Sequence, residues 1–173
     1  DEVIGKIASA QQPDGYLNVY FTVVEPEKRW KNLGMWHELY CAGHLIEAAV
    51  AHYEVTGKRS FLDVMCRYAD YIATVFGPGP GQRWGAPGHQ EIELALIRLY
   101  HTTGKKKYLD LSKFFINQRG QKPSVFQREL AHLSEEDSRT NRHFFDKKDG
   151  FDTSYCQDHL PAKDQSEVVG HAV

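Results

Sequence analysis

Apolar residues recur at alternating steps of three and four along much of this chain, which is the spacing of one face of an amphipathic helix. The clearest stripe runs through residues 61–75, and similar stripes cover residues 39–53, 92–100 and 108–115. Glycine favours the left-handed conformation that often ends a helix, and the stripes are followed by Gly57, Gly77, Gly104 and Gly120. The pattern therefore predicts four helices of roughly 15 residues joined by short connections.

The chain contains an internal repeat. The Thr-Gly-Lys segment at 56–58 returns 47 residues later at 103–105, and Tyr53 maps onto Tyr100 at the same offset. A period of about 45 residues built from two helices is typical of stacked helical hairpins. We therefore expect an all-α fold, either an open solenoid or a closed toroid whose inner helices run parallel.

The repeat also predicts where two histidines lie. In a toroid, the N-termini of the inner helices gather at one mouth, where unpaired backbone N–H groups favour oxygen-rich ligands. The helices predicted to start near Trp36 and Gly88 occupy equivalent places in the repeat, and each begins with a histidine. We therefore expect His37 and His89 to lie together at this mouth.

Three segments without helical periodicity are predicted to be long loops: residues 13–36, 77–88 and 121–164. The second is rich in glycine and proline and delivers His89 to the start of a helix. The third carries many charges and several aromatic residues. A stretch of that length without clear structure is usually functional or disordered, and its aromatics favour packing against the rest of the protein.

Composition narrows the class of protein. The 173 residues are 41% hydrophobic and 25% charged, with a formal net charge of −2, which is ordinary for a globular domain and gives no electrostatic footprint for nucleic acid. No apolar run approaches the roughly 20 residues that cross a bilayer. Three cysteines without a CxxC pair do not make a disulfide framework, so we expect a reducing, cytoplasmic compartment. The first residue is not Met and no helix stop follows the last one, so we expect a piece of a longer protein.

The densest polar constellation lies at the predicted start of the first of these helices. His37, Cys41 and His44 share one helix face and could bind zinc, although the pattern is not the HExxH of metalloproteases. A helix-start histidine that reaches into a pocket, or hydrogen-bonded packing, fits the pattern better. Glu91 and Glu93 could form a catalytic carboxylate pair, but residues i and i+2 of a helix point to different sides.

Two further histidines have weak local signals. Cys156 and His159 form a Cys-x-x-His pair, but no second pair lies at a suitable spacing, so we interpret them as loop structure. Gly170-His171 repeats the glycine–histidine theme seen at His89. No phosphate-binding glycine loop, nucleophile elbow or EF-hand pattern is present.

Several motifs follow one another in a characteristic order. They occupy residues 14–17, 36–48, 88–96, 119–120, 155–161 and 169–173, and they read DGYL, WHELYCAGHLIEA, GHQEIELAL, RG, YCQDHLP and VGHAV. In order and rough spacing, across essentially the whole chain, they resemble glycoside hydrolase family 127, the beta-L-arabinofuranosidase family. Ala162, where the family more often has Val, is a small departure.

The resemblance implies that residues 1–173 are a fragment of one (α/α)6 barrel catalytic domain, incomplete in this chain. It implies that His37, His89 and His171 bind the sugar, and that Trp36 and Tyr40 are candidates for the pocket wall. The implied reaction is the hydrolysis of beta-linked L-arabinofuranosides with retention. The nucleophile would be a cysteine thiolate held by zinc, with a glutamate as the acid/base.

The family's catalytic cysteine, glutamates and zinc ligands lie downstream of the segment that matches residues 169–173. We therefore expect no catalytic residue and no metal ligand in this chain, which should be inactive alone, and zinc only in the complete enzyme. Cys41, Cys66 and Cys156 match neither nucleophile nor ligand, and the first two are expected to be small buried residues. The expected partners are an arabinofuranoside glycan and the rest of the barrel, without nucleic acid or membrane.

Two other interpretations remain open from the sequence. One is a non-catalytic helical-repeat scaffold that binds a protein or peptide, which accounts for the 47-residue period but not for the histidines at helix starts. The other is a different (α/α)6 carbohydrate-active enzyme whose acid and base are carboxylates in this chain.

Overall fold

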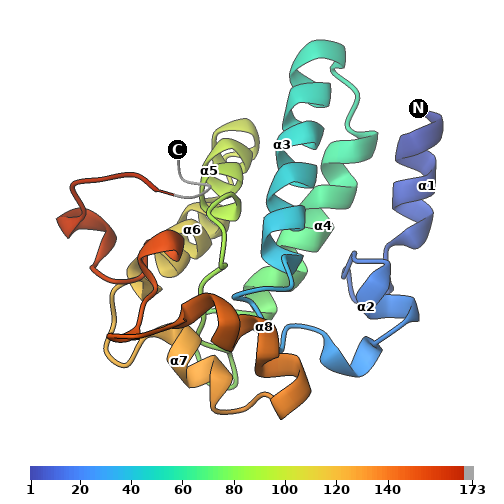
Figure 1. Cartoon of the computed structure of the whole chain (residues 1–173). Coiled ribbons are helices and arrows are strands. Elements are labelled where there is room, and N and C mark those ends of the chain that lie inside the picture. Colours follow the sequence, from blue (N-terminus) through green and yellow to red (C-terminus); the bar gives the residue numbers. More distant parts are fainter. Residues whose placement is uncertain (170–173) are drawn as a thin grey trace.

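The computed structural model describes residues 1–169 and confirms the all-helical architecture (Figure 1). The predicted helices form two hairpins, α3 (Glu38–Thr56) with α4 (Ser60–Val75), and α5 (Ile92–Thr103) with α6 (Lys106–Gln118). The hairpins pack side by side, α3 against α5 and α4 against α6, and α1 (Glu2–Ala10) packs against α4. This two-layer arrangement is the one expected for part of an (α/α)6 barrel. None of the described helices is long and apolar enough to cross a membrane.

Two glycines at equivalent positions of the repeat end α3 and α5. Gly57 and Gly104 adopt the left-handed conformation with φ of 68° and 69°. Their N–H groups donate to the carbonyls of Tyr53 and Tyr100 at 2.8 and 2.7 Å. The 47-residue repeat therefore reflects a repeated turn geometry. After each turn the chain reverses direction and begins the antiparallel partner helix.

One continuous hydrophobic core lies between the hairpins, with fully buried side chains from all four helices, including Ile46, Leu62, Ile72, Leu96 and Phe115. Tyr16 and Trp30, from the segment predicted as the first loop, also belong to this core. That loop is therefore packed, and it covers the end of the core at which α3 begins.

A glycine sets the distance between α3 and α5. A Cβ atom at Gly43 would lie 2.6 Å from Cγ of Glu91 and 2.8 Å from the backbone nitrogen of Ile92. These distances are shorter than any ordinary contact, so only glycine lets the start of α5 lie this close to α3. The packing of α5 on α3 thus requires a residue without a side chain at position 43, and the hydrophobic pattern of the sequence does not predict this requirement.

The segment 121–164, predicted as a long loop, is instead largely structured. It contains α7 (Val125–Leu130), α8 (Glu135–Phe145), an antiparallel hairpin of β1 (Asp146–Lys147) and β2 (Gly150–Phe151), and two 3-10 turns, η2 (Ser154–Cys156) and η3 (Ala162–Asp164). Ser124 and Ser134 cap the two helices, and each side chain accepts a backbone N–H. α7 has only six residues, and α8 is polar except for Phe144 and Phe145 at its end, so neither shows an apolar stripe and the prediction missed them.

The N-terminal part differs from the prediction in a smaller way. α1 was not predicted, and the segment 13–36 holds the short helix α2 (Tyr20–Val23) and the 3-10 turn η1 (Pro26–Lys28). The segment 77–88 lacks helix, as predicted, but the irregular stretch continues to Glu91. His89 therefore precedes α5 by three residues and does not begin it, contrary to the prediction.

Polar contacts fasten α7 and α8 to the segment that leads into α3, and Figure 1 shows both helices beneath the start of α3. The Glu129 carboxylate accepts the backbone N–H groups of Leu33 and Gly34 at 2.7 and 3.0 Å. The side-chain amides of Asn32 and Asn141 exchange two hydrogen bonds of 2.6 and 3.0 Å. Burial raises the pKa of the Glu129 carboxyl to about 7 against the opposing effect of those two N–H donors. These hydrogen bonds therefore hold α7, α8 and the segment before α3 together as one unit.

We predict that Gly43→Ala forces α5 away from α3 and destabilises the protein by about 1–3 kcal/mol, because overpacking a close contact displaces backbone. Thermal unfolding of the full-length protein measures this. The matched control is Gly5→Ala in α1, where nothing lies within 4 Å of the added Cβ and the helix should be neutral or gain stability. An unchanged midpoint for Gly43→Ala would contradict the close-contact argument.

Candidate functional site

His37 occupies a strained position at the start of α3. It is the N-cap residue of this helix and adopts the left-handed conformation, with φ of 59° and ψ of 15°. A residue with a Cβ pays on the order of 1 kcal/mol or more for that conformation, so the surrounding structure must hold it there. Trp30 and Gln157 are the other non-glycine residues with positive φ in the described part of the chain. Strain of this kind commonly gathers at functional sites.

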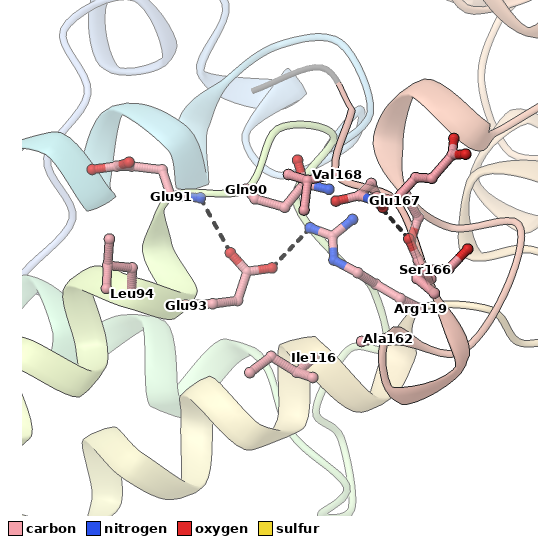
Figure 2. A pocket seen from close by; sticks show the side chains of 12 residues that line it. Gln90, Glu91, Glu93, Leu94, Ile116, Arg119, Ala162, Ser166, Glu167 and Val168 are labelled. Carbon is pink, nitrogen blue, oxygen red and sulfur yellow. Dashed lines mark hydrogen bonds and ion pairs between the residues drawn. The ribbon is translucent and has the colours of Figure 1, made fainter. Parts of the chain in front are cut away.

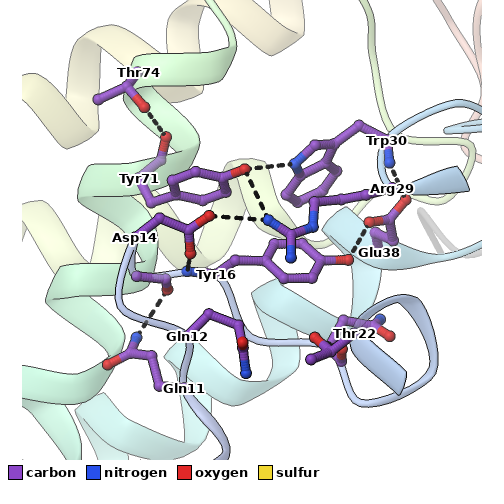
Figure 3. Close-up of polar contacts among 12 residues, drawn as sticks. Gln11, Gln12, Asp14, Tyr16, Thr22, Arg29, Trp30, Glu38, Tyr71 and Thr74 are labelled. Atoms are coloured by element: carbon purple, nitrogen blue, oxygen red, sulfur yellow. Dashed lines mark hydrogen bonds and ion pairs between the residues drawn. The ribbon is translucent and has the colours of Figure 1, made fainter. Parts of the chain in front are cut away.

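The buried Glu38 carboxylate holds the entry to α3, and Figure 3 shows its surroundings. It accepts the backbone N–H of Trp30 at 2.7 Å and the hydroxyl of Tyr16. The Tyr16 ring lies against Trp30 with ring centroids 5.3 Å apart, and the Arg29 guanidinium lies 3.7 Å from its centre. Burial raises the pKa of Glu38 to about 7, and the hydrogen bonds from Tyr16 and Trp30 act in the opposite direction. The Glu38 carboxylate therefore anchors the loop before α3 to the residue that follows His37.

The loop that carries His89 is anchored by Arg119, which follows α6. Its guanidinium donates to the carbonyls of Cys156 and Pro87 at 2.5 and 3.0 Å. It also donates to the Glu93 carboxylate at 2.8 Å, the contact that Figure 2 shows. Both charged side chains are almost fully buried, with 4% and 10% of their surfaces exposed. Paired in this way, Arg119 fixes the backbone two residues before His89 and one residue after Tyr155.

These anchors bring two histidines and two tyrosines together, which we call the histidine–tyrosine cluster (His37, Tyr40, His89 and Tyr155). The rings of His37 and His89 have centroids 4.6 Å apart. Tyr40 lies 5.8 and 5.6 Å from these two rings, and Tyr155 lies 5.9 Å from His89. Four aromatic rings with polar tips thus converge where α3 begins and the loop before α5 passes. Imidazole and phenol groups can both donate and accept hydrogen bonds, which suits a ligand rich in hydroxyls.

The predicted juxtaposition of His37 and His89 is present in the structure. The Tyr40 ring lies against both histidine rings. Trp36 lines a cavity next to His37, but its ring stacks on Phe21 with centroids 5.4 Å apart. His171, the third predicted sugar-binding histidine, lies outside the described residues.

Tyr155 was missed as a site residue. It lies in η2, far from His89 in sequence, within the segment that the sequence placed in a loop. The sequence signal that could have found it is its position as the first residue of the YCQDHLP motif. In the structure, Arg119 binds the carbonyl of the next residue, Cys156. Its ring also lies against Phe144 of α8 with centroids 5.0 Å apart, so α8 helps to position it.

The carboxylates considered as a catalytic pair point to different partners. Glu93 binds Arg119, whereas Glu91 lies 3.2 Å from Nδ1 of His44. Burial raises the pKa of Glu91. Both residues line the cavity beside α5 and α6, but Glu93 is held by Arg119 and Glu91 lies against His44, so the structure does not support a two-carboxylate site at these positions.

Within residues 1–169, no three His, Cys, Asp or Glu side chains are grouped so that they could hold a metal ion. Burial raises the pKa of the Cys156 thiol to about 12, which keeps the thiol protonated at neutral pH. Cys66 is buried as expected, but Cys41 is exposed, so that prediction was wrong. Cys41 faces the gap between α3 and the N-terminal segment, where it lines a shallow cavity with Ile7 and Leu17.

A cavity of about 590 Å³ lies beside α5 and α6, as Figure 2 shows. The charges of Glu93 and Arg119 at its wall already satisfy each other. Leu94 and Ile116 contribute exposed apolar surface to it. The Gln90 side chain donates to the Cys156 carbonyl, and the Gln157 side chain donates to that of Gln165. Several polar groups of this cavity are therefore already engaged, and the histidine–tyrosine cluster is the better candidate site.

Comparisons with known proteins agree with this fold. The chain is 38% identical over 177 aligned residues to a non-reducing end beta-L-arabinofuranosidase of Bifidobacterium longum, covering all of this chain and 26% of that protein. Among solved structures, a beta-L-arabinofuranosidase of glycoside hydrolase family 127 from Geobacillus stearothermophilus superposes with a TM-score of 0.86 at 55% identity, over 98% of this chain and 26% of that one. A second beta-arabinofuranosidase of the same family gives a TM-score of 0.73 at 39% identity, over 98% and 24%.

The model of the beta-L-arabinofuranosidase catalytic domain of glycoside hydrolase family 127 matches residues 1–173. The fold is a helical barrel segment with an imidazole-lined mouth, and the chain belongs to this family. It spans about a quarter of the length of the relatives it matches. The resemblance seen in the motifs is therefore confirmed.

We predict that Glu38 makes stability depend on pH. Its folded pKa of about 7 exceeds the usual 4.5, so the folded state binds the proton more tightly, and stability falls as pH rises between these values. Glu38→Gln keeps an acceptor for the Trp30 N–H and replaces the titratable carboxyl with an amide that does not titrate. The fall in unfolding free energy between pH of about 5 and about 8 should shrink by on the order of 1–3 kcal/mol.

Thermal unfolding of the full-length protein at several pH values measures this difference. Glu136→Gln, at an exposed carboxylate in the first turn of α8, is the control and should leave the pH dependence unchanged. If both variants kept the wild-type pH dependence, the anchoring carboxyl would not be the titrating group.

Proposed function

We propose that this chain forms one wall of the sugar site of a glycoside hydrolase that releases L-arabinofuranose from beta-linked arabinofuranosides with retention. The observation that carries the proposal is the 4.6 Å approach of the His37 and His89 rings at the mouth of the helical hairpins. Family membership supports the reaction class, and the relatives are named for beta-arabinofuranosidase activity.

The histidine–tyrosine cluster suits the hydroxyls of a furanose ring. A neutral imidazole accepts a hydroxyl proton at one nitrogen and donates from the other, so two adjacent imidazoles can bind neighbouring hydroxyls. In the proposal His37 and His89 hold these hydroxyls, and His171 adds a third contact. Tyr40 and Tyr155 close the sides with their rings and hydroxyl groups.

The contribution of this chain is binding and orientation. Holding the ring in a fixed pose lowers the entropic part of the barrier for groups that attack the anomeric carbon. The proposal places the nucleophilic cysteine and the acid/base glutamate in the rest of the protein, so this chain alone would not turn over substrate. A complete protein with the remainder of the barrel is thus the partner that the activity requires.

The described residues do not fit a zinc site, since no three candidate ligands converge. We propose that zinc belongs to the complete enzyme and is held by residues outside this chain. No step of the present proposal passes through the metal.

We predict that His89→Ala and His37→Ala in the full-length enzyme each lower kcat/KM for a beta-L-arabinofuranoside by roughly 10- to 100-fold. A lost hydrogen bond that leaves a hydroxyl unpaired costs about 1–3 kcal/mol in the transition state. Thermal midpoints should change little, because the histidine side chains lie at the mouth and not in the core.

The control is His101→Ala, an exposed histidine in the last turn of α5, at the end opposite the mouth. It should keep wild-type kinetics. Wild-type kinetics for His37→Ala and His89→Ala as well would remove the basis of the proposed function.

A further inference from the structure

A second cavity adjoins the histidine–tyrosine cluster and shares His37 with it. It has a volume of about 430 Å³ and lies between α2, η1 and the first turns of α8. Tyr20 and Phe21 line it from α2, and Trp36 lines it from the segment before α3. Small-molecule sites of about 300–1,000 Å³ are usual, so one sugar residue fits this space.

The aromatic residues of this cavity differ in whether their ring faces are already packed against other side chains. The Trp36 ring stacks on Phe21 and carries the Lys28 ammonium 5.6 Å from its centre, so it is already engaged. Tyr20, by contrast, is 50% exposed, while its hydroxyl donates to the Glu25 carboxylate at 2.9 Å. That hydrogen bond orients the Tyr20 ring and leaves much of its surface open. Such a ring can pack against the C–H face of a sugar.

The charges around the cavity select the kind of ligand. Lys28 is held between Glu25 and Asp137, each at 2.8 Å, and Glu136 is exposed nearby in α8. Three carboxylates and one ammonium group thus line the cavity. Carboxylates accept hydrogen bonds from hydroxyls strongly, but they repel a ligand that carries its own carboxylate or phosphate. The lining therefore favours a neutral, hydroxyl-rich ring.

We propose that this cavity binds the neutral sugar residue to which the arabinofuranose is linked, with Tyr20 as its stacking platform. His37 connects the two spaces, since it lies against His89 on one side and lines the cavity on the other. A ring held by the histidine–tyrosine cluster would place its linked neighbour here. This inference rests on the proposed function and assigns to the cavity the choice of the leaving sugar.

The test compares two substrates in the full-length enzyme. Methyl beta-L-arabinofuranoside has a leaving group too small to reach Tyr20, whereas a beta-linked arabinofuranosyl disaccharide fills the cavity. Tyr20→Ala should raise KM for the disaccharide by about tenfold, with kcat/KM for the methyl glycoside unchanged, because only the second sugar loses its stacking contact. The control is Trp84→Ala, an aromatic residue of similar exposure, 56%, that lies outside this cavity. It should leave both substrates unaffected.

The outcomes separate the two proposals. Wild-type enzyme that hydrolyses neither substrate would overturn the proposed function and this inference with it. Wild-type enzyme active on both substrates, with Tyr20→Ala affecting both equally or neither, would overturn this inference alone.

A disaccharide whose second sugar bears a carboxylate should be a poorer substrate than its neutral analogue. A preference for the acidic sugar would contradict the argument from the charges that line the cavity.

Discussion

The arrangement of the mouth depends on one buried carboxylate. Glu38 stands one residue after the strained His37, and it binds the Trp30 N–H and the Tyr16 hydroxyl. A buried carboxyl is costly unless it is protonated or fully bonded, and here its partners lie on the loop that precedes α3. The same contact therefore closes the end of the core, fixes the loop and holds His37 in its left-handed conformation. Without it, the direction of the His37 ring would be undetermined.

Arg119 provides the corresponding constraint on the other side. It ties the carbonyls of Pro87 and Cys156 to Glu93, so the segments that carry His89 and Tyr155 cannot move independently. The two anchors belong to different hairpins, and the close packing permitted by Gly43 sets the distance between them. The histidine–tyrosine cluster is thus a product of hairpin packing, and its rings are positioned before any ligand arrives.

Much of this arrangement could be predicted from the sequence. The helical period and the repeated Thr-Gly-Lys turns gave the hairpins, and the repeat placed His37 beside His89. The rest could not be predicted, because it depends on contacts between distant segments. α7 is too short and α8 too polar to show an apolar stripe, and they are fixed by Glu129 and Asn141, whose partners lie about a hundred positions earlier at Leu33 and Asn32. Tyr155 joins the cluster only because those segments fold back beneath α3, and the exposure of Cys41 depends on where the N-terminal segment lies.

We have proposed that His37 and His89 bind the same sugar. A crystal structure of the full-length protein with bound L-arabinose tests it most directly. We expect sugar hydroxyls within about 3 Å of ring nitrogens of both histidines, with the Tyr40 ring alongside. Arabinose bound elsewhere, for example in the cavity beside α5 and α6, with neither histidine in contact, would contradict it.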